Sequence, residues 1–185
     1  MKQHFFEKEI CYDGTQLRSH WIFDQTGFVG DAIAAFVGPA DVSTKHMVDL
    51  VDVRNNAPIA SRSMLHVVVE HFGCDLEKGI LRQRLLIVAV HEELLTHAVC
   101  ANVIRRGNDL YDGEQKLSVS IAALSPVSCC IHFGINIVSA GTPVPTKGLT
   151  DYEISPHPFA TRLLTRYTEE LRTIEIARCK VRPIV

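Results

Sequence analysis

The sequence is poor in the features that mark membrane and nucleic-acid-binding proteins. Even the apolar stretch LLIVAV at 85–90 is followed at once by His91 and falls far short of the roughly 18 to 20 residues that cross a bilayer. The 185 residues carry a formal charge of −2, so no basic surface for a phosphate backbone is indicated. Charged residues also interrupt the first ten positions, where a secretion signal would be apolar. We expect a cytoplasmic protein that binds neither nucleic acid nor a membrane.

The sequence also lacks the cysteine spacing of a metal site or a disulfide framework. Its six cysteines form no CxxC pair, and in a cytoplasmic chain most are expected to be small buried apolar residues. Four residues nevertheless offer side chains that can ligate a metal: His66, His71, Cys74 and His132. His66 and His71 differ in strand parity and would point to opposite faces of a strand. The hypothesis of a metal site is therefore weaker than the two functions considered below, and no metal is assigned.

No repeat, low-complexity segment or linker divides the chain. With 46% hydrophobic residues, a chain of 185 residues can form one full core but is short for two domains. We therefore expect a single domain over residues 1–185. A homodimer is the default expectation for a soluble oligomer.

The hydrophobic pattern predicts strands on both sides of one long helix. Strands are indicated at 8–14, 32–38 and 63–72, and again from 97 to about 138. Asp75 is a suitable N-cap for a helix of about five turns. Its buried side is predicted to carry Leu76, Ile80, Leu81, Leu85, Val88 and Leu95. A second helix is indicated by Pro158 and the apolar residues after it. This order, without regular βαβ alternation, predicts an α+β domain on a largely antiparallel sheet.

Two alternating strands flank Ser125 and Pro126 and are expected to pair as a hairpin. If their apolar faces are buried together, the loop must contain an odd number of residues. A three-residue loop then gives three polar pairs: Ser120 with His132, Ser118 with Gly134, and Lys116 with Asn136. A five-residue loop shifts each pairing by two residues and leaves the same residues on the face. These six residues form either the floor of a ligand pocket or an ordinary polar face in water.

The segment NDLYDGEQK at 108–116 places an acid beside a base. The Asp112-Gly113 turn folds the chain back so that Lys116 returns toward Asn108 and Asp109. A carboxylate that can hold Mg²⁺ would then stand near an ammonium that can neutralise an anion, as phosphate or adenylate chemistry requires. An ordinary surface ion pair is the alternative.

The segment 141–158 holds four prolines and two glycines and shows no periodicity. It is long for a plain connection, so it is expected either to cover a site or an interface or to be a surface excursion.

The text NDLYDGEQKLSVSIA, followed by HFGIN at 132–136, resembles the catalytic core of the biotin and lipoate protein ligase family. The biotin branch carries Asn-Asp-Leu-Tyr, a turn, Lys-Leu-Ala-Gly and later Gly-Ile-Asn, and the lipoate branch carries Arg-Asn-Asp-Leu and Lys-Val-Ser-Gly-Ser. The matched region covers roughly residues 75–138. The resemblance implies a ligase-like fold, related to class II aminoacyl-tRNA synthetases, with a mixed, mostly antiparallel sheet and helices on one side.

The same resemblance implies a chemistry. In such enzymes a small carboxylic acid is activated with ATP and Mg²⁺ as an acyl-adenylate and is passed to a lysine of a carrier protein. By this resemblance Lys116 contacts the acid or its adenylate, while Asn108 and Asp109 contribute to the nucleotide and metal region.

Departures from the family pattern leave two functions open. The stretch at 53–72 keeps Arg54 and Arg62, which would balance phosphate charge, but has no glycine run. Ser118-Val119 stands where the family has a glycine shortly after its lysine. The chain is therefore either an ATP-dependent acyl ligase or transferase, or a non-catalytic module that binds a small carboxylate or a nucleotide. In a further variant Cys130 is a nucleophile and His132 lies about 7 Å away along the strand.

The whole chain, including GDAIAAFVGPADV, LRQRLLIV and KLSVSIAALSPVS, is also similar to an uncharacterised prokaryotic family, the domain of unknown function numbered 366. Membership implies the same ligase-like fold and no established activity.

Overall fold

A five-stranded sheet organises the chain in the computed structural model, which describes residues 1–57, 59–140 and 144–184. Its order is β1 (Lys2–Phe6), β2 (Ala32–Val42), β3 (Ile59–Phe72), β8 (Ser128–Asn136) and β7 (Ser118–Leu124). β1 runs parallel to β2, and the other neighbouring pairs are antiparallel. The predicted α+β class with a mostly antiparallel sheet is confirmed.

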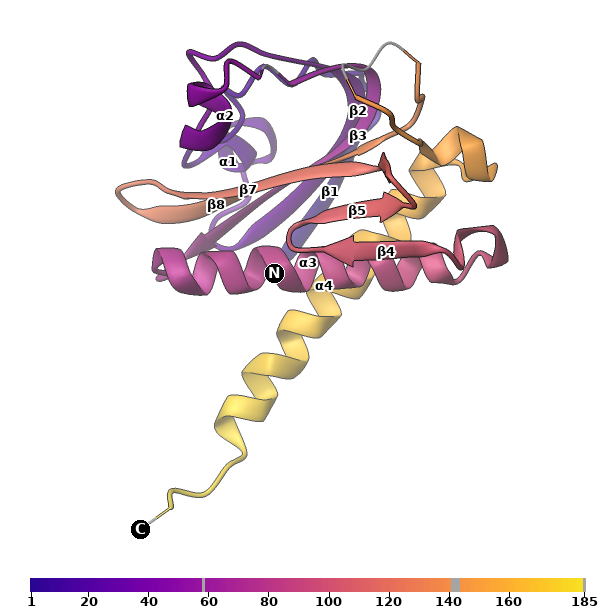
Figure 1. Cartoon of the computed structure of the whole chain (residues 1–185). Helices are drawn as coiled ribbons and strands as arrows, with labels where there is room; N and C mark the ends of the chain where they lie inside the picture. The colour runs from indigo at the N-terminus through magenta and orange to yellow at the C-terminus, as the bar shows by residue number, and fades with distance from the viewer. Residues whose placement is uncertain (58, 141–143, 185) are drawn as a thin grey trace.

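Helices and a small second sheet surround this main sheet (Figure 1). The long helices α3 (Leu76–Leu95) and α4 (Pro156–Cys179) cover one face, while the short helices α1 (Trp21–Thr26) and α2 (Leu50–Arg54) lie on the other side. The small sheet has the order β4 (Val103–Arg106), β5 (Asp109–Asp112) and β6 (Gln115–Lys116). Two 3-10 turns, η1 (Ala98–Cys100) and η2 (Leu149–Tyr152), complete the elements. No helix in the described ranges is long and apolar enough to span a bilayer.

The two faces of the main sheet belong to different cores because side chains alternate along each strand. Toward α3 and α4 the sheet presents Leu65, Val67, Val69, Ile131, Phe133 and Ile135. Toward α1 it presents Phe36 and Val68, which pack with Trp21 and Tyr12. Both faces are therefore covered near β2 and β3, and β3 and β8 are nearly continuous buried strands.

The helix predicted from Asp75 is confirmed, but the prediction of its buried side was wrong. Asp75 is the N-cap, and its side chain accepts the Lys78 N–H at 2.7 Å. The buried residues of α3 include Gln83 and Glu93. The predicted side is largely in solvent, with these exposed residues: Leu76, Ile80, Leu81 and Leu95. Two polar side chains could be buried because each finds hydrogen-bond partners there.

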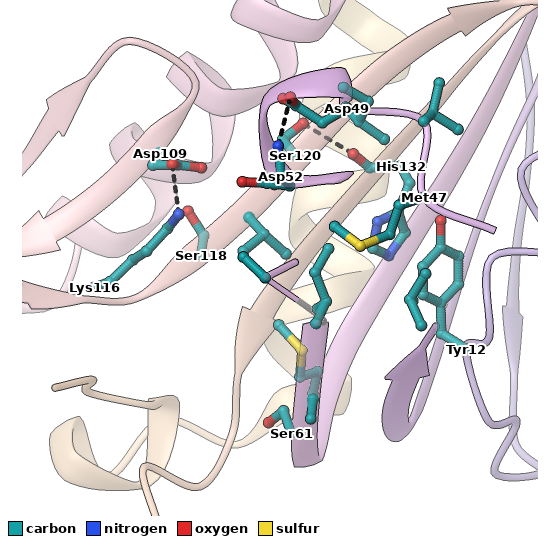
Figure 2. A pocket seen from close by; sticks show the side chains of 18 of the residues that line it. Tyr12, Met47, Asp49, Asp52, Ser61, Asp109, Lys116, Ser118, Ser120 and His132 are labelled. Carbon is teal, nitrogen blue, oxygen red and sulfur yellow. Dashed lines mark hydrogen bonds and ion pairs between the residues drawn. The ribbon is translucent and has the colours of Figure 1, made fainter. Parts of the chain in front are cut away.

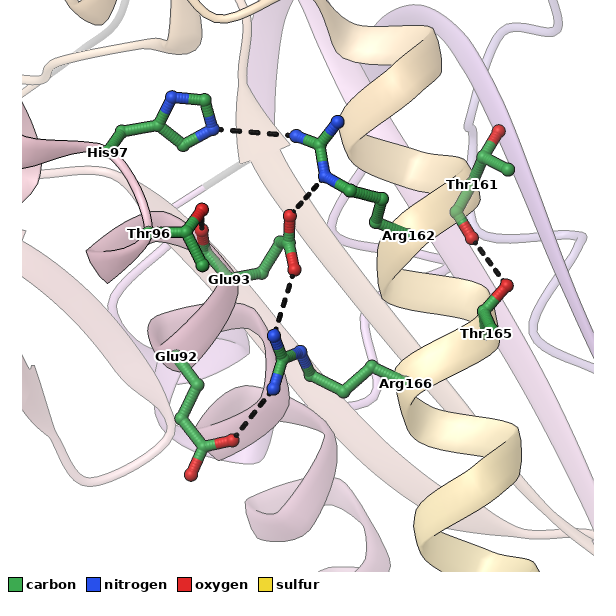
Figure 3. A network of polar contacts seen from close by, with 8 residues as sticks. All are labelled: Glu92, Glu93, Thr96, His97, Thr161, Arg162, Thr165 and Arg166. Carbon is green, nitrogen blue, oxygen red and sulfur yellow. Dashed lines mark hydrogen bonds and ion pairs between the residues drawn. The ribbon is translucent and has the colours of Figure 1, made fainter.

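Glu93 joins α3 to α4 through two arginines (Figure 3). Its carboxylate is almost fully buried and accepts from Arg162 Nε and, at 3.2 Å, from Arg166 Nη2. Arg166 also reaches Glu92, and Arg162 reaches His97. The charge of Glu93 is thus balanced by two cations, which is the condition under which a buried carboxylate is tolerated.

The second predicted helix is confirmed as α4, which begins at Pro156, two residues before Pro158. Two predicted strands were misplaced. The first strand is β1 at Lys2–Phe6 rather than 8–14, where only Tyr12 makes an isolated bridge to Ala40. The chain after His97 enters η1 before β4 begins at Val103.

Candidate functional site

A cavity of about 420 Å³ lies on the sheet face opposite α3 and α4 (Figure 2). Its floor comes from the main sheet, including Met64 and His132. One wall comes from Asn108, Asp109 and Lys116. Its roof is the segment from His46 to Ala57, which contains α2. Val144 and Thr146 also line the cavity, so the 141–158 connection contributes to it from residue 144 onward, as one of the two alternatives for this segment expects; residues 141–143 lie outside the described residues.

The predicted hairpin forms, but its register differs by one residue from the prediction. Leu124 pairs with Cys129, which leaves four residues, 125–128, between them. The observed pairs include Ser120 with Phe133, Ser118 with Ile135, Ile121 with His132 and Val119 with Gly134. Lys116 does not pair with Asn136, because β6 pairs with β5 instead. Because the loop holds an even number of residues, the polar residues of β7 lie on the opposite sheet face from His132 and Gly134.

Hydrogen bonds hold the hydroxyl of Ser120 against α3 and that of Ser118 against β5. The Ser120 hydroxyl accepts from Gln83 Nε2 at 3.0 Å and donates to the His132 carbonyl at 2.9 Å. The Ser118 hydroxyl accepts the Leu110 N–H at 3.0 Å. Buried hydroxyls with such partners cost little, so Val119 and Ile121 are left to face the cavity. The assumption that apolar faces must be buried together failed here.

Most of the predicted site residues line the cavity. Those that do are Asn108, Asp109, Lys116, His132, Asn136 and also Ser118 and Ser120, although the two serine hydroxyls are engaged by the hydrogen bonds just described. Gly134 does not line it, because a side chain there would meet Met64 Cε at 3.0 Å, so Met64 occupies the space the glycine leaves. Arg54 and Arg62 are exposed and stand outside the lining.

Asp109 and Lys116 form the ion pair that the sequence predicted. Lys116 Nζ lies 2.8 Å from Asp109 Oδ2, and the β5–β6 turn at Gly113 brings them together. Asp109 Oδ1 is buried without a hydrogen-bond partner in the described ranges. Burial raises the pKa of the Asp109 carboxyl, while the Lys116 ammonium lowers it. The polar wall of the cavity thus holds an ammonium that still has donors to offer. Beside it stands a carboxylate with one oxygen that accepts no hydrogen bond from the described residues.

Neighbouring groups hold this wall in place. Asn108 Nδ2 donates to the Ser120 carbonyl at 2.8 Å. The Asn136 amide accepts from the Ser61 hydroxyl and lies 3.5 Å from the Lys116 carbonyl. The Lys116 N–H donates to the Pro145 carbonyl at 3.0 Å. These bonds orient the wall without using the Lys116 ammonium.

Tyr12 and His132 form the far end of the floor, and the buried His66 lies directly behind them. His66 Nε2 lies 3.2 Å from the Gly38 carbonyl, and its Nδ1 lies 3.0 Å from His132 Nε2. The Tyr12 ring stacks on His132 with centroids 3.6 Å apart. Because the Gly38 carbonyl needs a donor, His66 Nδ1 must accept from His132 Nε2–H. His132 Nδ1 is then unprotonated and can accept a hydrogen bond.

Burial keeps both rings neutral. It lowers the pKa of His66 to about 4 and the pKa of His132 well below its ordinary value. Burial also raises the pKa of Tyr12, so its hydroxyl stays protonated. This end of the cavity offers flat, uncharged ring surface.

Several lining residues were not predicted from the sequence. They are mainly Tyr12, Met47, Asp49, Asp52, Ser61, Met64, Val119 and Ile121. Tyr12 lies in a loop that pairs with β2 through Ala40. Asp49 caps, and Asp52 belongs to, a short helix without a buried residue. No local pattern marks such residues. Only their position over the sheet brings them to the site.

The metal and cysteine hypotheses gain no support from the geometry. Among the described residues no group of three or more His, Cys, Asp or Glu side chains is arranged to hold a metal. His71 lies on the other sheet face, where it contacts Asp31 and Tyr167. Cys130 does not line the cavity, and burial raises its pKa to about 11, which disfavours the nucleophilic thiolate.

Comparison with solved structures identifies the fold as that of the biotin and lipoate protein ligases. A biotin protein ligase variant from Aquifex aeolicus in complex with biotin gives a TM-score of 0.61 at 18% identity, covering 93% of this chain and 70% of that one. Protein Ta0514 from T. acidophilum with bound lipoic acid gives 0.62 at 12% identity, covering 93% and 87%. At these identities the likeness concerns the fold alone.

The chain belongs to the family described as domain of unknown function (DUF366), which it matches over residues 1–182. An uncharacterized protein, MJ0805 of Methanocaldococcus jannaschii, is 34% identical over 188 residues, covering 98% of this chain and 84% of that protein. A protein of unknown function from Pyrococcus horikoshi has a structure with a TM-score of 0.91 and 34% identity, with full coverage of both chains. Both resemblances stated from the sequence are thereby confirmed.

Proposed function

We propose that this protein binds a small carboxylic acid in the cavity, as a binding module. The ligand carboxylate lies at Lys116 and its apolar part lies between Tyr12, Met47 and Ile121. One observation carries the proposal: Lys116 is the one lysine or arginine among the described residues that line the cavity, and it stands at one end of the cavity with Tyr12 at the other (Figure 2). Pockets of this volume with few convergent polar groups are typical of small-molecule sites.

Lys116 has the capacity to hold a carboxylate. An ammonium has three donors, and Asp109 occupies one of them. The lysine side chain is still partly exposed to the cavity. Two of the solved ligase-fold structures hold biotin and lipoic acid, which are both small carboxylic acids with an apolar body.

The residues present do not fit a nucleoside triphosphate, which is what the acyl-adenylate function requires. Arg54 and Arg62 stand outside the cavity, so Lys116 would face the phosphates while already paired with Asp109. The orphaned Asp109 Oδ1 could serve Mg²⁺, but one lysine does not balance a polyphosphate. Adenylation therefore stands as the alternative function, together with its carrier-protein partner. The homodimer also stays a prediction.

Calorimetric titration with biotin, lipoate and octanoate tests the proposal. Lys116→Gln should weaken acid binding by about 10- to 100-fold, since a hydrogen bond to a charged group contributes roughly 1.5–3 kcal/mol. Lys147→Gln is the matched control, because Lys147 pairs with Asp112 outside the cavity lining. It should bind the acids as the parent protein does.

A double variant separates the ammonium from the fold. Asp109→Asn with Lys116→Gln keeps a neutral hydrogen-bonded pair in place of the ion pair, so its folding should be preserved while its affinity for the acid stays low. Binding of none of the three acids, or undiminished binding by the double variant, would refute the proposal. Pyrophosphate release on adding ATP and Mg²⁺ with an acid would establish the adenylating alternative instead.

A further inference from the structure

We infer that the ligand of this cavity carries an ammonium group beside its carboxylate, as an apolar α-amino acid does. The inference rests on the proposed function and specifies its ligand class. It starts from the charges of the cavity wall, where Lys116 is outnumbered by Asp49, Asp52 and Asp109. Residue 58 is proline and residues 141–143 are glycine, threonine and proline, so they add no charge to this count.

Two of the three carboxylates are already engaged. Asp109 binds Lys116 through Oδ2. Asp49 is the N-cap of α2, where its Oδ1 accepts the N–H groups of Val51 and Asp52 at 2.8 and 3.3 Å. A capping carboxylate is stabilised by these donors and by the helix dipole. Asp49 therefore does not require a cation from a ligand.

Asp52 is different. Its carboxylate lines the cavity and is half-buried, and no hydrogen bond or ion pair joins it to any residue in the described ranges. Its backbone carbonyl accepts from Ala57, but that bond leaves the side chain free. Among the described residues of this wall, Asp52 is thus the carboxylate that lacks a counter-charge.

Asp52 stands close enough to act on the ion pair of the wall. Figure 2 shows its carboxylate on the Asp109 and Lys116 side of the cavity. Burial is the largest influence raising the pKa of Asp109, and the negative charge of Asp52 raises that pKa further. Arg84 of α3 lowers it, but Arg84 does not line the cavity. A ligand in the cavity therefore meets one ammonium and a free carboxylate together.

This arrangement discriminates between a simple acid and a zwitterion. A simple carboxylate that binds Lys116 also meets the negative field of Asp52. An α-amino acid carries its ammonium on the carbon next to the carboxylate, so the carboxylate can bind Lys116 while the ammonium faces Asp52. At about 4 to 5 Å and an effective dielectric constant near 20, such a pair corresponds to about a 300- to 1000-fold preference, and partial exposure reduces this to roughly tenfold. The apolar side chain then lies on Tyr12 and Ile121.

Matched ligand series test the inference by titration calorimetry of the whole protein. One series is phenylalanine, 3-phenylpropanoate and 2-phenylethylamine, which carry both charged groups, the carboxylate alone and the ammonium alone. A second series is leucine, 4-methylpentanoate and 3-methylbutylamine. We expect an amino acid of at least one series to bind about tenfold or more tightly than its partner without the ammonium.

Asp52→Asn should remove this preference. The variant should bind the amino acid about tenfold more weakly and the simple acid somewhat more tightly than the parent protein does. Asp41→Asn is the control, because Asp41 is exposed and does not line the cavity, and it should keep the parent preference.

The outcomes separate this inference from the proposed function. Binding of simple acids with no gain from the ammonium would overturn the inference and leave the acid-binding function standing. A preference that survives in Asp52→Asn would also overturn it. If neither amino acids nor simple acids bind at millimolar concentration, both fail.

Discussion

Acid should destabilise this protein between pH 6.5 and 4, because two histidines are buried as neutral rings beneath the cavity. Burial lowers the pKa of His66 to about 4 and the pKa of His132 well below its ordinary value. In an unfolded chain a histidine binds its proton near pH 6.5. Below that pH the unfolded state therefore binds protons that the folded state does not. The neutral buried rings therefore leave the free energy of unfolding undiminished above about pH 6.5. That free energy falls as the pH drops below 6.5 and through the folded pKa.

The expected magnitude follows from the shift of His66. Between about pH 7 and 4.5 its linkage alone lowers the free energy of unfolding by about 2.5 kcal/mol, and His132 adds to this loss. Carboxyls with lowered pKa values, such as those of Asp31 and Asp112, act in a lower window, below about pH 4. Asp109 opposes the trend, since its raised pKa makes the folded state gain protons as the pH falls.

Urea denaturation at constant ionic strength across this range measures the effect. His66→Gln should show a smaller fall in unfolding free energy with pH, because one buried neutral ring is gone. His157→Gln is the control, since His157 is exposed on α4, and its pH dependence should match the parent. An unfolding free energy that does not change between pH 6.5 and 4.5, or a His66→Gln variant with the full slope, would refute the reasoning.

Other substitutions give sharp expectations for stability and binding. Gly79→Ala would usually stabilise a helix by about 1 kcal/mol, but here the new Cβ would lie 2.1 Å from Cys129 Sγ. We expect a net loss of roughly 1–2 kcal/mol, relieved in a Gly79→Ala/Cys129→Ala double-mutant cycle followed by urea denaturation; a stabilised single variant would contradict this. Gly134→Ala should push Met64 into the cavity, since the new methyl group would lie 3.0 Å from Met64 Cε. Its loss of acid-binding free energy in calorimetry should exceed its loss of unfolding free energy in thermal denaturation. Glu93→Gln should cost about 2–3 kcal/mol, because it leaves two α4 arginines without their buried counter-charge while their own exposure screens part of the effect; an unchanged urea midpoint would show that the network contributes little.

The parts of the site that were predictable depend on local signals. The Asp112-Gly113 turn brings Lys116 back to Asp109, and the 2.8 Å ion pair is the result. Asp75 determines where α3 begins because a capping carboxylate acts on the next three residues. The ligase-like motif lies in this same stretch, so the fold family was also accessible from the sequence. Each of these features needs contacts across only a few positions.

The orientation of β7 and α3 was not predictable by the same means. In both elements polar residues are buried and apolar ones are left outside. Ser120 and Gln83 are buried together because they hydrogen-bond to each other, and Glu93 is buried because α4 supplies two arginines. A periodicity argument assigns the apolar side to the core, and it fails wherever a polar residue finds its partner on a distant element.

The sequence by itself determined the α+β class, the long helices, the Asp109–Lys116 wall and the family to which the chain belongs. Tertiary structure alone decided what else stands around that wall. Tyr12, Asp52 and His132 reach the cavity from three separate parts of the chain, and Arg54 and Arg62 are kept away from it. Turns and caps are encoded over a few residues, whereas the shape and charge of a cavity depend on how distant segments pack. For that reason the sequence pointed to a lysine that could hold an acid, and only the fold showed beside it the carboxylate of Asp52, which has no partner among the described residues.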